Sequence, residues 1–256
     1  MMKNDNSEKS GFISHLVELK QRLINSFIFL FSFFVVCYFF SEEIYSFLVQ
    51  PYADAVKDDN VNRRLIFTAL QETFLTYLRV SFFAALFVSS PIILMQIWKF
   101  VAPGLYKNEK EAILPYLIAT PILFLFGGML VYYLIMPLAI KFFLSFEASS
   151  INSALPIQLE AKVNEYLSLV MKLIFAFGLS FQLPVILSLL ARVGFIDSVF
   201  LKERRKYVVV IIFVAAAILT PPDPITQIGL AIPLLILYEL SIFSVKIIEK
   251  RKNKNA

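Results

Sequence analysis

Long apolar segments, separated by short stretches that hold most of the Lys and Arg residues, limit how this chain can fold more than any other feature. A bilayer core of about 30 Å is crossed by roughly 20 helical residues. With 59% hydrophobic residues, 17% charged residues and a mean hydropathy of +0.74, the chain is more apolar than a soluble domain. We therefore expect an all-α polytopic membrane protein. Six apolar segments are expected to span the membrane: residues 23–40, 73–98, 112–140, 163–191, 207–219 and 228–245. The third is expected to be broken by Pro121, Gly127–Gly128 and Pro137.

The fifth segment is unusually short. Its residues, 207–219, form a helix of only about 20 Å at 1.5 Å per residue. The sequence TPPDPITQ at residues 220–227 then forces a turn, because closely spaced prolines cannot continue a helix. A re-entrant hairpin and two short spans are the alternatives. We favour two short last spans that thin the bilayer locally, because basic residues flank both far ends.

The distribution of basic residues predicts the orientation. If residue 1 is cytoplasmic, the segments on its side hold 17 of the 24 Lys and Arg residues, and the opposite segments hold 5. Cytoplasmic loops are enriched in these residues, so both termini are expected in the cytoplasm. The first segment lacks a small-residue cleavage site, and no cleavable signal peptide is expected. The expected parts are a cytoplasmic amphipathic segment at residues 1–22, one six-span membrane domain at 23–245 and a basic cytoplasmic tail at 246–256.

The connection at residues 41–72 is longer than a hairpin needs. SEEIYSFLVQPYADAV, residues 41–56, places the apolar side chains of Ile44, Phe47, Leu48 and Pro51 on one side of a helix. LIFTALQETF, residues 65–74, is a second short amphipathic stretch. We therefore expect a small extracytoplasmic cap of interfacial helices.

Catalytic and metal-binding motifs are not found in the sequence. The single Cys, Cys37, and the single His, His15, leave no material for an intramolecular disulfide or a His/Cys metal site. No phosphate-binding glycine loop and no Ser-His-Asp set are present. We expect that the protein is not an enzyme and that it binds no metal and no cofactor. The pI of about 9.2 is attributed to basic cytoplasmic loops rather than to nucleic-acid binding. Transport, recognition or assembly is therefore the expected class of function.

Two cytoplasmic glutamates each have two interpretations. HLVELKQRL, residues 15–23, repeats Leu at helical spacing and predicts an amphipathic helix lying at the membrane interface. Within it, Glu18 either pairs with Arg22, which is worth ~0.3–0.5 kcal/mol, or offers its carboxylate to a ligand. Glu109, in YKNEK at residues 106–110, is either a solvated loop residue or a second ligand-binding carboxylate.

Polar residues inside the apolar segments also need partners. An unpaired amide is costly in lipid, so Gln182 is expected to contact protein or a cavity. It either makes an interhelical hydrogen bond, worth on average ~0.6 kcal/mol, or meets a partner helix. Pro184 frees a carbonyl that Gln182 can reach. Lys172 is expected to snorkel, and Arg79 and Glu239 to snorkel or to pair.

Four motifs in order resemble the TatC family over about residues 12–248: HLVELKQRL, QIWKFVAPGLYKNEK, FGLSFQLPV and LTPPDPITQ. TatC proteins are the polytopic subunit of the twin-arginine translocase, which exports folded proteins across the cell inner membrane using the proton-motive force. The resemblance implies a receptor for signal peptides with an Arg-Arg pair. It also implies a scaffold for the single-span proteins TatA and TatB, in a homo-oligomer within a hetero-oligomeric complex.

The resemblance also implies site residues. Glu109 is implied as the main contact for the arginine pair, with Glu18 contributing, because carboxylates bind guanidinium groups through charge-assisted, bidentate bonds. Gln182 matches the polar position that meets the TatA or TatB helix. The further signal-peptide-binding positions are Lys20, Arg22, Phe100, Pro103, Leu105 and Tyr106. Pro51 matches a proline of the first outer loop, and Asp223 matches the acidic residue of the turn after the fifth span.

The sequence departs from the family pattern at four of these or nearby positions. Asn108 stands where some members have His, Lys20 where many have Arg, and Lys172 is unusual in the fourth span. Gln182 stands at a position that is Glu or Gln in this family, and Gln in place of Glu removes a titratable group, which puts a proton-relay role at that position in doubt.

A small-solute secondary transporter is the alternative function. Broken helices and Gln182 would suit a substrate site, whereas the lack of an inverted repeat and of a charged pair at mid-membrane argues against it. An open concave face without a pore would favour a scaffold. A third class, a structural anchor, predicts that Glu18 and Glu109 are dispensable together.

Overall fold

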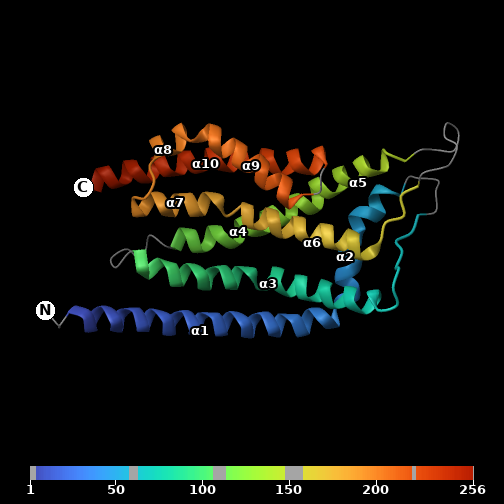
Figure 1. Ribbon diagram of the computed structural model, residues 1–256, viewed down its shortest axis with the longest axis horizontal. Coiled ribbons are helices and arrows are strands. Elements are labelled where there is room, and N and C mark those ends of the chain that lie inside the picture. The colour runs from blue at the N-terminus through green and yellow to red at the C-terminus, as the bar shows by residue number, and fades with distance from the viewer. Residues whose placement is uncertain (1–3, 58–62, 106–113, 148–157, 221–222, 256) are drawn as a thin grey trace.

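The computed structural model describes residues 4–57, 63–105, 114–147, 158–220 and 223–255, and long helices lying side by side dominate it (Figure 1). We call the end where α1 begins and α10 ends the termini end, and the opposite end the α2 end. The elements are α1 (Asn4–Phe39), α2 (Ser41–Ala55), α3 (Glu72–Leu105), α4 (Leu114–Leu130), the π-helix η2 (Val131–Ile135), α5 (Met136–Leu144), α6 (Val163–Ser180), α7 (Leu183–Val193), α8 (Ser198–Glu203), α9 (Arg205–Leu219) and α10 (Pro224–Asn255).

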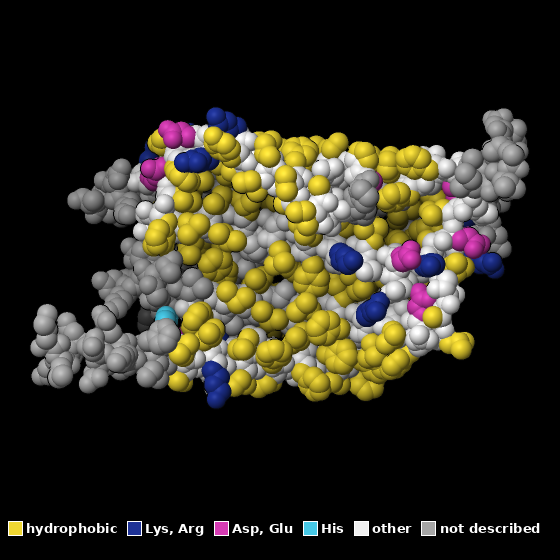
Figure 2. All heavy atoms as spheres, viewed as in Figure 1, with side chains coloured by type: hydrophobic (Ala, Val, Ile, Leu, Met, Phe, Trp, Pro, Cys, Tyr) yellow, Lys and Arg dark blue, Asp and Glu magenta, His cyan; other side chains and the backbone are white. Residues whose placement is uncertain are grey.

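Five helical stretches in the described part of the chain are long and apolar enough to cross a membrane. They are His15–Phe39, Glu72–Phe100, Pro115–Leu144, Val163–Val193 and Pro224–Lys250. The all-α polytopic fold is thereby confirmed, and the face shown in Figure 2 is a broad apolar band with most of its charges near the ends. Such a surface is stable against lipid but not against water. The number of spans and their orientation stay predictions.

The last two apolar segments form a hairpin of unequal helices. The expected short fifth helix is present as α9, whose 15 residues measure about 22 Å. The sixth segment belongs to a longer helix, because α10 continues for 32 residues with no helix breaker after its apolar run, and the length of its membrane span stays a prediction. The part of α10 beside α9 is nevertheless short, since Glu239 of α10 pairs with Arg205, the first residue of α9.

The third segment is less broken than expected. α4 continues through Pro121 and both glycines, and only the π-helix η2 interrupts the regular helix, directly before Pro137, which offers no N–H to the preceding turn. Gly127 is instead a place of close approach. A Cβ there would lie 2.8 Å from the carbonyl oxygen of Phe177, so glycine allows α4 and α6 to pack backbone to backbone.

The first segment also differs from expectation. α1 runs from Asn4 to Phe39 without a break, so residues 15–23 continue the first membrane helix rather than forming a separate interfacial helix. Only 6% of the residues in the apolar stretch of α1 are buried, compared with 56% of those in the apolar stretch of α6 and α7. α1 is therefore a peripheral helix that packs mainly on α3, and α6 lies at the centre.

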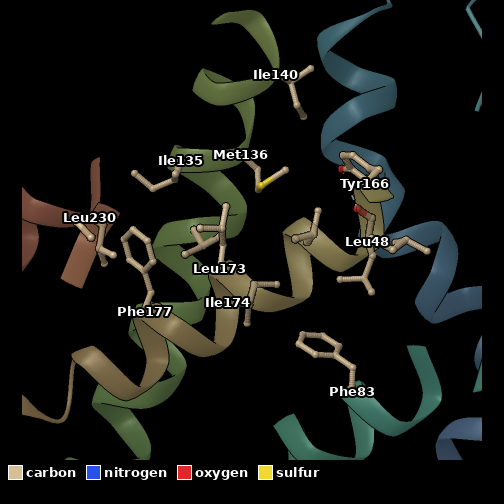
Figure 3. Packing of buried hydrophobic residues seen from close by; sticks show 14 of the residues in the cluster. Leu48, Phe83, Ile135, Met136, Ile140, Tyr166, Leu173, Ile174, Phe177 and Leu230 are labelled. Carbon is tan, nitrogen blue, oxygen red and sulfur yellow. Dashed lines mark hydrogen bonds between the residues drawn. The ribbon is translucent and has the colours of Figure 1, made fainter. Parts of the chain in front are cut away.

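The core gathers around α6. Leu173 and Phe177 of α6 are fully buried and face Ile135 and Met136, and Leu230 of α10 lies beside Phe177 (Figure 3). The packing therefore joins the third, fourth and last apolar segments. This core fixes the helices whose ends carry the candidate site.

At the α2 end, α2 crosses the bundle and docks on η2 and α6. Pro51 lies inside α2 and has no N–H for the carbonyl of Phe47, four residues earlier. The hydroxyl of Tyr132 donates to that carbonyl oxygen at 2.8 Å, and the hydroxyl of Tyr166 donates to the carbonyl oxygen of Leu48 at 3.1 Å. Leu48, Pro51 and Tyr52 are buried, which confirms part of the expected apolar face, whereas Phe47 is exposed and stacks on Tyr132.

The expected helix at residues 65–74 is wrong for its first half. Ile66 instead forms an isolated parallel bridge with Lys162, and α3 begins only at Glu72, whose carboxylate accepts from the backbone N–H of Thr68 at 2.8 Å. The connection is held elsewhere by Arg63, whose guanidinium donates to both carboxylate oxygens of Glu147 at 2.5 and 2.6 Å.

Candidate functional site

Glu18 lies on α1 near the termini end and is bonded to Arg22. Arg22 Nε donates to Glu18 Oε1 at 3.0 Å, and Nη2 donates to the same oxygen. The remaining group, Nη1, donates to Oε1 of Gln96 on α3 at 3.3 Å. The expected pairing of Glu18 with Arg22 is confirmed, and the sequence did not indicate Gln96 as its anchor.

The second carboxylate oxygen of Glu18 is less committed. Oε2 lies 3.6 Å from His15 Nδ1, and the Glu18 side chain is 36% exposed. The His15 ring packs on the ring of Phe100 with centroids 5.0 Å apart. Because Phe100 belongs to α3, this contact holds the Glu18 turn of α1 against the last part of α3. Lys20 lies on the same helix and is exposed.

α3 then leads into the segment with the second glutamate. Pro103 and Leu105 were expected in a loop, but the backbone of α3 stays helical to Leu105. Tyr106 and Glu109 lie in residues 106–113, outside the described residues. The geometry therefore fixes Glu18, Arg22 and Phe100 as neighbours at the helix end from which the Glu109 segment leaves.

Gln182 lies between α6 and α7 and is buried. Its Nε2 donates to the carbonyl oxygen of Thr120 on α4 at 2.9 Å, so the interhelical hydrogen bond is confirmed, although it does not go to the carbonyl freed by Pro184. Gln182 Oε1 and Thr120 Oγ1 are buried without a hydrogen-bond partner among the described residues. The amide nitrogen of Gln182 thus has a hydrogen-bond partner, and its amide oxygen has none among the described residues.

Asp223 precedes α10 as its N-cap and is buried. Its Oδ1 accepts from the backbone N–H of Thr226 at 2.7 Å, and its Oδ2 accepts from the Thr226 hydroxyl. Pro224 occupies the first helical position, where its missing N–H costs nothing. This arrangement explains why the turn after α9 carries an acidic residue.

Further polar contacts link α8 and α9 to α10 at the termini end. Arg205 Nη2 donates to Glu239 Oε2 at 2.6 Å, which confirms that Glu239 pairs. Glu249, near the end of α10, accepts from the backbone N–H and the hydroxyl of Ser198 at 2.6 and 2.5 Å and so ties the basic end of α10 to α8. In the described ranges, no group of three His, Cys, Asp or Glu side chains is placed to hold a metal.

Comparisons with known proteins identify the family. The family model of the Sec-independent protein translocase protein (TatC) matches residues 14–233. The chain belongs to the TatC family. A TatC protein of Magnetococcus marinus is 48% identical over 98% of this chain and 89% of its own length, and one of Rickettsia prowazekii is 45% identical over 96% of both.

A solved structure agrees with the assignment. The crystal structure of the twin-arginine translocase receptor TatC matches the fold with a TM-score of 0.76 and 35% identity, covering 92% of this chain and 99% of that chain. The chain is therefore a multi-pass membrane protein of the TatC family with a role in protein translocation, and it works in a complex with other translocase subunits.

Proposed function

We propose that this TatC protein is the receptor for signal peptides with an Arg-Arg pair and the scaffold on which TatA and TatB assemble. In this proposal it lies in the cell inner membrane as a six-span protein with both termini in the cytoplasm. The placement of α1 and α10 supports this topology, because a chain that begins and ends on one side crosses an even number of times (Figure 1). α9, the fifth apolar segment in chain order, then adds one crossing to the five long stretches and makes six.

The observation that carries the proposal is the contact between the Glu18 turn and the end of α3. Arg22 bonds Glu18 to Gln96, and His15 packs on Phe100. The segment with Glu109 leaves α3 five residues after Phe100. Glu18 and the end of α3, from which the segment with Glu109 leaves, thus lie at one end of the bundle, and in this proposal an extended peptide from the cytoplasm binds both carboxylates there.

The resting pairing of Glu18 suggests how it binds. Its Oε1 already accepts two bonds from Arg22, and among the described residues Oε2 has only His15, whose Nδ1 lies 3.6 Å away. An incoming guanidinium can donate to Oε2 or displace Arg22, and in either case the planar fork of arginine suits a carboxylate better than the point charge of lysine. The positive charges of Arg22 and Lys20 would then repel a single cation from the site.

Gln182 is proposed to contact a TatA or TatB helix through its unsatisfied half. The donor Nε2 is held by Thr120, and Oε1 is left without a partner in the described ranges. Because the side chain is only 5% exposed, such a contact needs α4 and α7 to move apart locally. The hydrogen bond to Thr120 then holds the position closed until a partner binds.

Site-specific photocrosslinking in membranes tests the receptor role. The crosslinker is placed beside the carboxylates, at Gln21 and Asn108, so that Glu18 and Glu109 are kept. The bait is an Arg-Arg signal peptide, with the Lys-Lys peptide as the control. Crosslinks to the Arg-Arg peptide alone are expected. Equal labelling by both peptides, or none in membranes where the protein is folded, would reject the site.

A further inference from the structure

A lateral groove between α1, α3, α6 and the end of α9 carries two cations. We call it the α3–α6 groove. Its volume is about 900 Å³, and exposed apolar side chains such as Phe82, Leu179 and Ile218 line it, so it opens towards lipid. Its wall also includes Arg79 of α3 and Lys172 of α6. On the face shown in Figure 2, Lys and Arg side chains lie within the apolar band, and acidic side chains follow them towards the α2 end.

Neither cation is paired with a carboxylate in the part of the chain that the structure describes, although Glu72 and Glu165 line the polar pocket that Arg79 also lines. Arg79 donates to Oδ1 of Asn164, which is neutral, and among the described residues neither Arg79 nor Lys172 forms an ion pair. A cation against hydrocarbon is costly unless it meets a counter-charge or water. Two such cations facing one groove therefore point to an anionic group held between them.

A polar pocket continues from the groove towards the α2 end. This pocket has a volume of about 320 Å³, and its polar lining comprises Thr68, Gln71, Lys162 and Asn164 together with two carboxylates, Glu72 and Glu165, that can accept from headgroup hydroxyls. Arg79 lines both the polar pocket and the apolar α3–α6 groove. A polar chamber joined to an apolar one, with a cation at the junction, complements a molecule that has a polar head, an anionic neck and an apolar chain.

The short helix α9 brings the membrane surface to this depth. Ile218 and Leu219, the last residues of α9, line the same groove as Lys172, and α9 ends before the ends of α3 and α6 at the α2 end (Figure 1). Because α9 spans about 22 Å, it is roughly 8 Å shorter than a 30 Å core. Headgroups beside α9 must sink by about this amount, to the level of Lys172 and Arg79.

We propose that the α3–α6 groove binds one phospholipid of the leaflet at the α2 end. Arg79 and Lys172 hold its phosphate, the polar pocket takes its headgroup, and an acyl chain lies on Phe82, Phe175 and Leu179. Two cations favour a lipid with net negative charge, such as phosphatidylglycerol. This inference does not depend on the receptor role of Glu18 and Glu109, but it does rest on α9 crossing the bilayer.

Native mass spectrometry and lipid titration of the purified full chain test this site. The probes are phosphatidylglycerol, zwitterionic phosphatidylcholine and soluble glycerol phosphate, which has the anion without the chain. The variants are Arg79→Gln, Lys172→Gln and both together. Arg64→Gln is the matched control, because Arg64 is a strongly exposed cation at the same end of the molecule.

The expected result is tighter binding of phosphatidylglycerol than of phosphatidylcholine and no binding of glycerol phosphate. Each single substitution should weaken phosphatidylglycerol binding about fivefold, and the double substitution about 25-fold, as expected for a cation near a lipid surface. Arg64→Gln should change nothing, and Arg79→Lys should keep most of the binding, which separates loss of charge from misfolding. Undiminished binding by the double variant would overturn the proposal, as would crosslinking of an acidic partner helix at Lys172 in place of lipid.

Discussion

The hydroxyl of Tyr132 lies 2.8 Å from the carbonyl oxygen of Phe47 and replaces the backbone donor that α2 lacks at Pro51. The two rings also stack, with centroids 4.4 Å apart and planes 2° from parallel. The hydrogen bond that α2 loses at Pro51 is therefore replaced by one from Tyr132 in the π-helix η2. This link fixes how α2 crosses the bundle.

Tyr132→Phe should lower the free energy of unfolding by about 1–3 kcal/mol, because the Phe47 carbonyl loses its donor. Tyr133→Phe is the control, since Tyr133 is 69% exposed in the same π-helix. In a Pro51→Ala background the restored N–H can serve Phe47, so Tyr132→Phe should cost much less. Thermal unfolding in detergent of the four variants measures this coupling, and equal costs in both backgrounds would refute it.

The ion pair between Glu147 and Arg63 makes the stability of the α2 end depend on pH. The hydrogen bonds from Arg63 hold the pKa of the Glu147 carboxyl below its usual value of 4.5. A lowered pKa in the folded state adds stability that is present above pH 4.5 and is lost as the pH falls through the folded value. The melting temperature should therefore drop between pH 6 and pH 3.

Glu147→Gln should remove that part of the pH dependence and cost about 1.5–3 kcal/mol at pH 7, as expected for hydrogen bonds between charged groups. Glu160→Gln is the matched control, because Glu160 is exposed and lies 3.6 Å from Arg64 in a weak pair. If both variants keep the same acid response as the parent, Glu147 is not its source.

Gln182→Glu should make stability depend on pH. The new carboxyl can donate to the Thr120 carbonyl only when protonated, and an ionised carboxylate would face that oxygen without a donor. We expect the variant to match the parent at pH 5 and to be less stable by about 1–3 kcal/mol at pH 9. The parent measured over the same range is the control, and a variant with the parent's pH profile would show that the side chain leaves Thr120.

Two substitutions at Asp223 distinguish a structural role of its side chain from a role in export. Asp223→Ala should lower the free energy of unfolding by about 1 kcal/mol through loss of the α10 N-cap, whereas Asp223→Asn keeps a capping oxygen and should stay near the parent. Export of a folded reporter is measured beside the melting temperature. Loss of export by Asp223→Asn with unchanged melting would show that the charge acts beyond capping.

The fold was largely predictable because apolar length and basic residues are strong signals in a membrane protein. The ends and breaks of the helices were not, since packing decides them. Gly127 was read as a break and is a contact with Phe177, and residues 65–70 were read as helix because the bridge from Ile66 to Lys162 is invisible locally. Contacts between distant positions, such as Arg63 with Glu147, leave no local pattern.

The candidate site was predictable only by motif. The bond between Glu18 and Arg22 follows from their spacing, and it is present. Gln96 and His15 gave no signal, because their roles arise from the packing of α1 on α3. Lys172 was expected to snorkel as a single residue, and only the structure places it in one groove with Arg79.

Peptide affinity tests the central claim most directly. Binding of an Arg-Arg signal peptide to the protein in nanodiscs is measured for the parent, Glu18→Gln and Glu109→Gln, with the exposed Glu203→Gln as the control and the Lys-Lys peptide as the reference. We predict that Glu18→Gln and Glu109→Gln each weaken binding about tenfold or more, as expected for lost hydrogen bonds to charged groups, and that Glu203→Gln does not. Parental affinity in both variants would contradict the receptor role assigned to these carboxylates.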